Sequence, residues 1–286
     1  MINSNIQLKI KEVEKYISLL EGENNRLRTA LGEKTSTPEI EEEPSTPKAL
    51  LIGINYEGTE HALRGCINDV KRVENRLEKL KCFDNFTILT DETEVKPTRT
   101  NILKELKSLC SKAKEGETLF FHFSGHGTYT YDRNRDEKDR KDECIVSIDS
   151  KVITDDEIYN IIKSLPKRCN MIMIFDCCHS GTIADLKFSY VRNSRVARTN
   201  NRKNDIKANV ISISGCMDHQ TSADAYIQNK FQGAMTFAFL QYFSKDIPIH
   251  QLITRMRRLL RQRKFPQYPI LSCSSLVSLN QRFIWN

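Results

Sequence analysis

The chain has 286 residues, of which 39% are hydrophobic and 28% are charged, and its net charge is +7. With 11 Gly, 8 Pro and 9 Cys it is neither collagen-like nor a disulfide scaffold. Its apolar runs fall far short of the ~18 residues that cross a bilayer, and its first residues lack the apolar stretch of a signal peptide. We expect a cytoplasmic protein with reduced thiols and no membrane contact.

A heptad repeat covers residues 1–31. Its core positions hold Ile10, Ile17, Asn24 and Leu31 at a, and Ile6, Val13, Leu20 and Leu27 at d. This pattern predicts a coiled-coil helix that makes a homo-oligomer, with a parallel dimer favoured over a trimer. The other interpretation is a helix that packs against its own domain. Residues 32–47 contain three Pro among Thr, Ser and Glu, which predicts a disordered acidic linker.

From residue 48 to 286 we expect one folded domain, because apolar runs alternate with helical patterns. Strands are predicted at 49–54, 86–89, 118–123, 144–148, 171–175 and 210–214, and helices at 68–81, 100–113, 154–165, 233–243 and 248–264. Alternation of this kind with fully apolar strands predicts an α/β fold, a mostly parallel sheet with helices on both faces. Such folds bind ligands beyond the carboxyl ends of their strands.

Two predicted strands end in residues that can do chemistry. Strand 118–123 leads into the sequence SGHG at 124–127, and strand 171–175 leads into DCCHSG at 176–181. A cysteine nucleophile needs a base to form thiolate, and N–H donors for the oxyanion. His126 can be that base, and the N–H groups of Gly127 and Cys178 can be the donors. A zinc site is the alternative, but the chain has no C-x-x-C pair.

Successive sequence blocks resemble a type I metacaspase over roughly residues 48–245. They read ALLIGINY, GCINDV, FFHFSGHG, FDCCHSGT, SISGCMDHQTSADA and GAMTFAFL. The separation of 52 residues between His126 and Cys178 is close to the value of about 50 in caspase-type proteases. The resemblance implies a caspase-like sheet and a Cys178–His126 dyad that cleaves peptide bonds after Arg or Lys. Cys177 would then face the core.

The resemblance also implies a substrate-binding site. The family's acidic specificity pocket corresponds to Cys66, Asp69, Ser124 and Asp176. Asp69 and Asp176 would pair with a substrate guanidinium or ammonium group. The alternative for Asp176 is that it caps the turn after its strand.

Many members of this family need calcium, and their ligands correspond to Asp142, Asp155, Asp156 and Asp185. Carboxylate oxygens suit this hard cation, and no organic cofactor is expected. The loop 132–143 departs from the family pattern, because it has no Gly and many Lys or Arg. The segment between Asp142 and Asp155 also looks short. The alternative is that Asp155 and Asp156 only serve the start of their helix.

Positive charge is concentrated in two segments. Residues 187–207 hold seven Lys or Arg against one Asp, and residues 254–264 hold six and no acid. Neither has the interleaved aromatics of a nucleic-acid surface, so we expect no nucleic-acid partner. We interpret 187–207 as a mobile surface loop. Its candidate self-cleavage sites are Arg192, Arg195, Arg198, Arg202 and Lys203, with an uncut loop as the alternative.

The sequence therefore favours a calcium-stimulated cysteine endopeptidase that acts on proteins or peptides with Arg or Lys before the scissile bond. The alternative is a catalytically silent caspase-like scaffold that assembles through residues 1–31.

Overall fold

The computed structural model describes residues 49–81, 83–131, 141–177, 183–190, 197–199, 205–216, 224–227 and 230–283, and short stretches within 15–27. The chain divides into two compact units, Met1–Ser45 and Thr46–Asn286. In the first unit, residues 15–16, 18–20, 22–23 and 26–27 are helical and exposed. These helical residues agree with the predicted helix in the heptad region, whereas the coiled coil itself stays a prediction.

The second unit is built on an eight-stranded sheet with the order β2-β1-β3-β7-β10-β13-β8-β9. Its strands are β1 (Ala49–Gly53), β2 (Phe86–Thr90), β3 (Thr118–Ser124), β7 (Asn170–Asp176), β8 (Phe188–Tyr190), β9 (Arg198–Thr199), β10 (Asn209–Cys216) and β13 (Tyr268–Cys273). The neighbouring strands β2, β1, β3, β7 and β10 pair in parallel, whereas β13, β8 and β9 each pair antiparallel with the strand before them in this order. The predicted α/β fold with a mostly parallel sheet is confirmed.

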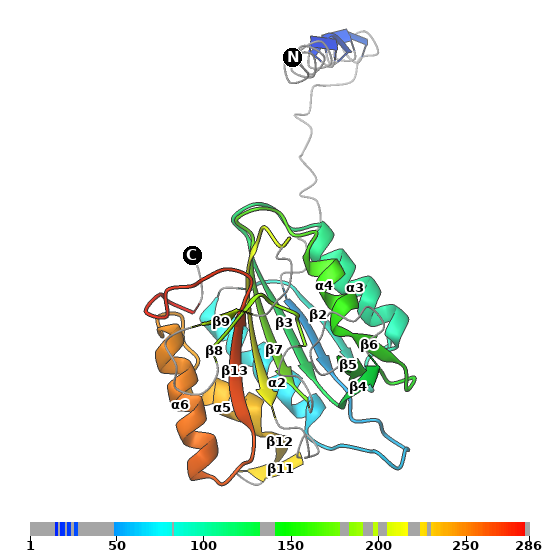
Figure 1. Ribbon diagram of the computed structural model, residues 1–286. Helices are drawn as coiled ribbons and strands as arrows, with labels where there is room; N and C mark the ends of the chain where they lie inside the picture. The colour runs from blue at the N-terminus through cyan, green and yellow to red at the C-terminus, as the bar shows by residue number, and fades with distance from the viewer. Residues whose placement is uncertain are drawn as a thin grey trace. The chain divides into compact units, whose positions relative to one another are not determined.

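Helices cover both faces of this sheet (Figure 1). One face carries α2 (Cys66–Leu80), α5 (Ala234–Tyr242) and α6 (Ile249–Gln262), and the other carries α3 (Arg99–Ser111) and α4 (Asp155–Ile162). Successive strand residues point to opposite faces, so Phe120 packs with α5 and Phe121 packs with the α3 side. Both side chains are fully buried, which is why the strands read as continuous apolar runs. No helix in the described ranges is long and apolar enough to cross a membrane.

The helices begin in two different ways. The predicted capping box of α4 is present: the Thr154 hydroxyl accepts a hydrogen bond from the Glu157 N–H, and the Glu157 carboxylate accepts one from the Thr154 N–H. In contrast, α2 and α5 follow the glycines Gly65 and Gly233, which offer no capping side chain. Their first N–H groups need partners from elsewhere in the fold.

The small sheets were not anticipated. β4 (Gly127–Tyr131), β5 (Lys141–Val146) and β6 (Val152–Thr154) form a three-stranded antiparallel sheet, and β11 (Asp224–Ile227) and β12 (Lys230–Gly233) form a two-stranded one. The apolar run predicted as strand 144–148 therefore belongs to β5 in a small sheet, outside the main one. Its residues Cys144 and Ile145 are buried there, because hydrophobicity specifies burial and does not specify the partner strand.

The basic segment 187–207 is not a surface loop along its whole length, so that prediction was wrong for residues 188–190 and 198–199, which form strands. β8 pairs with β13 and β9 pairs with β8, which makes a short hairpin at the sheet edge. Ser189 and Tyr190 are buried, and the Arg257 guanidinium donates a hydrogen bond to the Tyr190 carbonyl over 2.9 Å. Two aromatic residues in a short stretch are enough to anchor an edge strand that is otherwise flanked by positive charge.

Candidate active site

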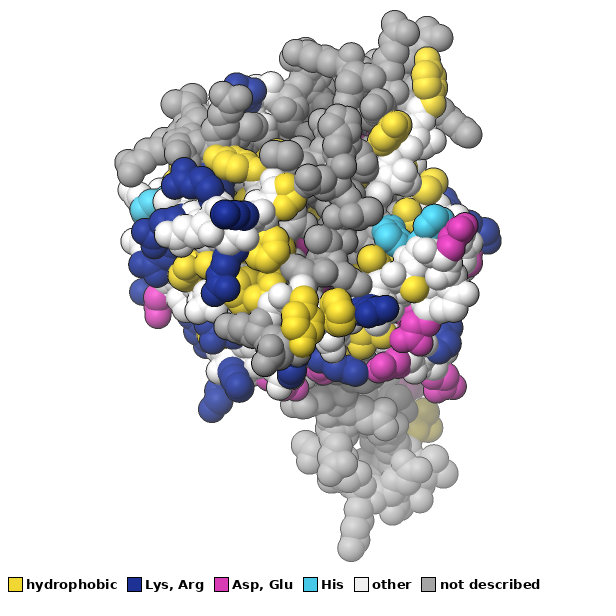
Figure 2. Space-filling view, turned by 90° about the horizontal axis from the view of Figure 1, so that it is seen from below, with side chains coloured by type: hydrophobic (Ala, Val, Ile, Leu, Met, Phe, Trp, Pro, Cys, Tyr) yellow, Lys and Arg dark blue, Asp and Glu magenta, His cyan; other side chains and the backbone are white. Residues whose placement is uncertain are grey.

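Several of the predicted site residues lie at the edge of the sheet where the parallel strands end. Ser124 at the end of β3 lies opposite Asp176 at the end of β7, and it also pairs with Gly53 at the end of β1. These carboxyl ends point downward in Figure 1. Figure 2 views the molecule from below and shows histidine side chains exposed beside hydrophobic ones on this face. The strand ends therefore bring Ser124 and Asp176 side by side.

His126 follows β3 and is held at three points. Its backbone N–H donates to the Tyr56 hydroxyl over 2.9 Å, and that hydroxyl donates to the Val146 carbonyl over 2.7 Å. The Tyr56 ring lies against the imidazole, with ring centroids 4.6 Å apart. The ring Nε2 lies 2.7 Å from the His61 carbonyl oxygen. A carbonyl only accepts hydrogen bonds, so Nε2 carries the hydrogen and the neutral ring keeps a free electron pair on Nδ1.

Gly127 begins β4 and can present its N–H to an oxyanion. The Val146 N–H donates to the His126 carbonyl over 3.0 Å. The neighbouring residues Gly127 and Ile145 are therefore a non-hydrogen-bonded pair of the antiparallel ladder. In such a pair the N–H points away from the partner strand, and the Gly127 N–H is left outside the ladder.

The predicted nucleophile, Cys178, lies outside the described residues. The preceding Cys177 is described, and its side chain is buried in the core on the α3 and α4 side of the sheet. That position agrees with the expectation that Cys177 faces the core.

Asp69 of α2 and Asp176 of β7, which we call the carboxylate pair, lie at the start of α5. Asp69 Oδ2 accepts hydrogen bonds from the Gly233 N–H and the Ser124 hydroxyl, each over 2.9 Å. Asp176 Oδ2 accepts one from the Thr236 N–H over 2.7 Å. The two side chains are fully buried and together provide the caps that α5 does not supply itself. The positive end of the helix dipole also stabilises negative charge here.

The carboxylate pair has perturbed ionisation. Burial and the charge of Asp176 raise the pKa of Asp69 well above its usual range, and hydrogen bonds from Gly233 and Ser124 lower it only in part. Burial likewise raises the pKa of Asp176. Within the described part of the chain, Asp69 Oδ1 is buried without a hydrogen-bond partner. Two adjacent buried carboxylates with a free oxygen form a site that a cation would stabilise.

Gly233 was not assigned a role from the sequence, although it opens the block GAMTFAFL. A Cβ atom at this position would lie 2.1 Å from Asp176 Oδ2 and 2.7 Å from Asp69 Oδ2. Only glycine lets the start of α5 approach both carboxylates. Tyr56 and the His61 carbonyl were also missed, because their contacts join segments that are far apart in the sequence.

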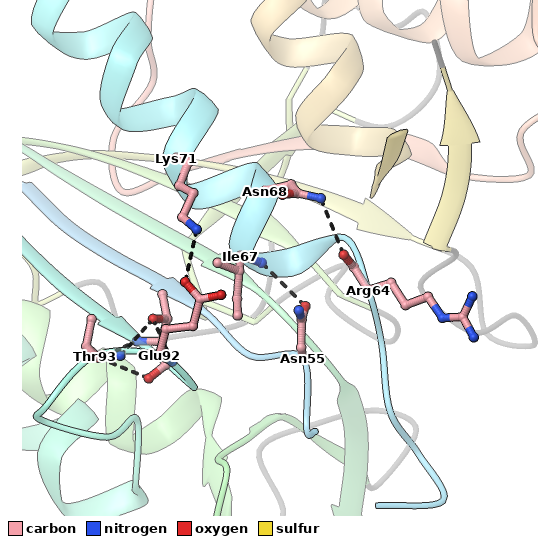
Figure 3. A network of polar contacts seen from close by, with 8 residues as sticks. Asn55, Arg64, Ile67, Asn68, Lys71, Glu92 and Thr93 are labelled. Carbon is pink, nitrogen blue, oxygen red and sulfur yellow. Dashed lines mark hydrogen bonds and ion pairs between the residues drawn. The ribbon is translucent and has the colours of Figure 1, made fainter. Parts of the chain in front are cut away.

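The start of α2 is held by a side chain from the segment that follows β1 (Figure 3). Asn55 Oδ1 accepts hydrogen bonds from the N–H groups of Cys66 over 3.1 Å and Ile67 over 3.4 Å. An ion pair between Lys71 and Glu92, 2.9 Å long, ties the same helix to the segment after β2. These contacts fix the first turn of α2, which carries two of the predicted substrate-binding residues.

Three of the four predicted metal ligands come together. The carboxylate oxygens of Asp155, Asp156 and Asp185 lie within 4.8 Å of one another. Asp142 in β5 is buried but does not belong to this group. Thr154 and Glu157 form the capping box of α4, and Asp155 Oδ1 also accepts a hydrogen bond from the Asp156 N–H over 2.8 Å. Three close carboxylates, two of them buried, repel one another unless a cation lies between them.

Of the five candidate self-cleavage residues, only Arg198 lies within the described residues. It is exposed in β9 and pairs with Ser189. Arg192, Arg195, Arg202 and Lys203 lie outside them.

Comparison with known proteins identifies the family of this chain. Residues 47–187 match the family model described as metacaspase, peptidase C14 domain. Metacaspase-3 of Trypanosoma brucei brucei is 38% identical, over 83% of this chain and 74% of that protein. Metacaspase-1 of Meyerozyma guilliermondii is 36% identical, over 83% and 72% respectively. These matches show that the chain is a cysteine-type peptidase. The chain belongs to the metacaspase family.

The fold has a solved counterpart as well. The crystal structure of protein GSU0716 from Geobacter sulfurreducens matches with a TM-score of 0.60 and 22% identity, covering 82% of this chain and 97% of that one. At that identity the likeness concerns the fold.

The carboxylate pair leads to a prediction about stability. Because the pKa of Asp69 is higher in the folded than in the unfolded state, its contribution to stability is fully present below the unfolded pKa and is lost as the pH rises from there through the folded pKa. We expect Asp69→Asn to raise the free energy of unfolding at pH 8 by about 1 to 3 kcal/mol and to flatten its pH dependence between pH 5 and 8, roughly the window above the ordinary carboxyl pKa. Urea unfolding of both proteins in a Cys178→Ala background measures this. A less stable Asn variant at pH 8 would contradict the electrostatic argument.

Proposed function

We propose that this metacaspase is an endopeptidase that cleaves after Arg or Lys, with Cys178 as nucleophile and His126 as base. One observation carries the specificity: a fully buried carboxylate pair in which Asp69 Oδ1 has no hydrogen-bond partner among the described residues. A guanidinium or ammonium group would supply the missing donor and the missing positive charge together.

The proposed reaction has two stages. His126 Nδ1 takes the proton of the Cys178 thiol, and the thiolate attacks the scissile carbonyl carbon. The N–H groups of Gly127 and Cys178 stabilise the oxyanion. His126 then gives its proton to the departing amine, which leaves a thioester. Water, deprotonated by the same Nδ1, attacks the thioester, releases the new carboxyl end and restores the thiol.

The substitution of single residues tests the assignment of the dyad. We expect Cys178→Ala to abolish cleavage and Cys177→Ala to keep most of it, because the side chain of Cys177 is buried in the core on the α3 and α4 side of the sheet. His126→Ala should lose at least about 100-fold in kcat, since a thiol of pKa ~8.5 is only a few per cent thiolate at pH 7. Peptide hydrolysis and labelling with a thiol-directed probe measure both effects. An unlabelled wild-type protein without hydrolysis would favour the silent-scaffold alternative.

The carboxylate pair makes a second prediction, on specificity. Peptides with Arg or Lys before the scissile bond should be cleaved, and peptides with Asp should be refused through like-charge repulsion. Asp69→Asn and Asp176→Asn should each lower kcat/KM for Arg substrates by about 100-fold, the loss expected for one partner of a buried charge pair. The matched control is Glu115→Gln, which removes an exposed acid paired with Arg168. Efficient cleavage after Asp would overturn the specificity.

We also propose that calcium binds the group of Asp155, Asp156 and Asp185. Their oxygens are close enough to share one ion, whose Ca–O distances are about 2.3 to 2.6 Å. Calcium would neutralise the group and hold the segment around Asp185, seven residues after Cys178, against the start of α4. The ion would act by ordering residues and would take no part in bond breaking.

A thermal measurement tests this proposal without activity. In a Cys178→Ala background, calcium at about 100 times its Kd should raise Tm by roughly 5 to 10 °C. The double variant Asp155→Asn with Asp156→Asn should lose this shift, and the control Asp246→Asn, an exposed acid paired with Arg282, should keep it. An equal shift in the double variant would rule out this ligand set.

Self-processing is the last proposed property. The segment 187–207 carries the residue types that the carboxylate pair should accept, and Arg198, one of the candidate sites, is exposed in β9. We expect active protein to yield two fragments divided within 187–207, and Cys178→Ala protein to stay intact. Deletion of residues 1–31 should slow the cut only if one chain cuts another held nearby. Mass spectrometry after incubation with calcium locates the cut, and an intact segment in enzyme that cleaves peptides would reject the proposal.

A further inference from the structure

His122 is a buried histidine that the proposed reaction does not use. It lies in β3 on the same face as Phe120, two residues before Ser124, in a row that is otherwise packed against α5. Its ring is fully buried, and Nε2 lies 3.1 Å from the Thr236 hydroxyl in the first turn of α5. Burial lowers the pKa of His122 to about 3, so the ring is neutral at any working pH.

Thr236 connects this histidine to the carboxylate pair. Its N–H donates a hydrogen bond to Asp176 Oδ2 over 2.7 Å, and its side chain interacts with the same carboxylate and lowers the pKa of Asp176. The Gln267 amide donates to Asp176 Oδ1 over 3.3 Å, and the Met235 backbone also lowers this pKa. These interactions favour the ionised form of Asp176 and oppose the effect of burial, which raises its pKa.

The direction of the hydrogens follows from this arrangement. A Thr236 hydroxyl that gives its one hydrogen to Asp176 accepts the hydrogen bond from His122. The neutral ring therefore carries its hydrogen on Nε2. In the other tautomer Nδ1–H would be buried, and Nδ1 has no hydrogen-bond partner in the described part of the chain. That tautomer would also make Nε2 compete with Asp176 for the hydroxyl hydrogen.

We propose that His122 is a positioning residue for substrate recognition: through the Thr236 hydroxyl it keeps Asp176 ionised and oriented toward the cationic side chain of the substrate. This inference rests on the proposed specificity for Arg and Lys. The chain of donors from His122 to Thr236 to Asp176 is cooperative, because each donated bond strengthens the next. The dyad does not belong to this chain, so the effect should fall on substrate binding.

Steady-state kinetics on the full chain test the inference. His122→Leu should raise KM for Arg peptides roughly tenfold, the worth of about one hydrogen bond, while alkylation of Cys178 by iodoacetamide stays within about twofold. His122→Gln, whose amide can donate to Thr236, should recover most of the loss. Thr236→Val should behave like His122→Leu, and Thr236→Ser should behave like the wild type. The control His250→Leu, which removes a hydrogen bond to the Leu279 carbonyl, should leave KM unchanged.

The outcomes separate this inference from the proposed function. If Asp176→Asn raises KM for Arg peptides but His122→Leu and Thr236→Val do not, the role of His122 is refuted and the specificity stands. If Asp176→Asn has no effect either, the specificity is refuted and the inference with it. Nitrogen NMR of 15N-histidine-labelled Cys178→Ala protein gives a second readout that does not need activity. It should show His122 as the neutral Nε2–H tautomer from pH 5 to 8, and an Nδ1–H tautomer would overturn the donor chain.

Discussion

Two buried carboxylates share the N-terminus of one helix, and most of the site depends on that contact. Asp69 and Asp176 cap α5 through the N–H groups of Gly233 and Thr236. Neither carboxylate would be stable inside the protein without these donors, because the transfer of an unpaired charge out of water is costly. The helix in turn would begin with unsatisfied N–H groups. One contact thus serves folding and places negative charge where a substrate cation can use it.

The start of α2 is also capped by a side chain from another segment, and the capping of α2 affects that of α5. Both follow a glycine, and both obtain their caps from side chains in other segments: Asn55 for α2, and the carboxylate pair for α5. Since Asp69 itself lies in the first turn of α2, the capping of α2 determines where the capping group of α5 stands. The strand β1, the helix α2 and the helix α5 therefore form one connected support beneath the site.

The sequence predicted the parts of this arrangement that local rules control. Alternating apolar runs located the parallel strands, and the strand-end rule brought together Ser124, His126 and Asp176. Contacts that depend on distant segments were not predictable: Tyr56 and His126 are 70 residues apart, and Asp69 and Gly233 are 164 apart. The composition led to one wrong prediction, for part of the segment 187–207. The positive charge of 187–207 predicted a surface loop, although Tyr190 in β8 is buried. Net charge describes a segment on average, whereas an edge strand needs only a few buried side chains.

The contact between His126 and the His61 carbonyl has a consequence for sequence variation. The main chain of residue 61 makes this hydrogen bond, and the side chain of His61 is 74% exposed. Other amino acids at position 61 can keep this hydrogen bond if the loop keeps its course, and they would lose only the edge contact between the rings of His61 and His126, whose centroids are 6.3 Å apart. Position 56 has no such freedom, because its hydroxyl both accepts from His126 and donates to Val146. Two residues that contact the same imidazole should thus evolve at very different rates.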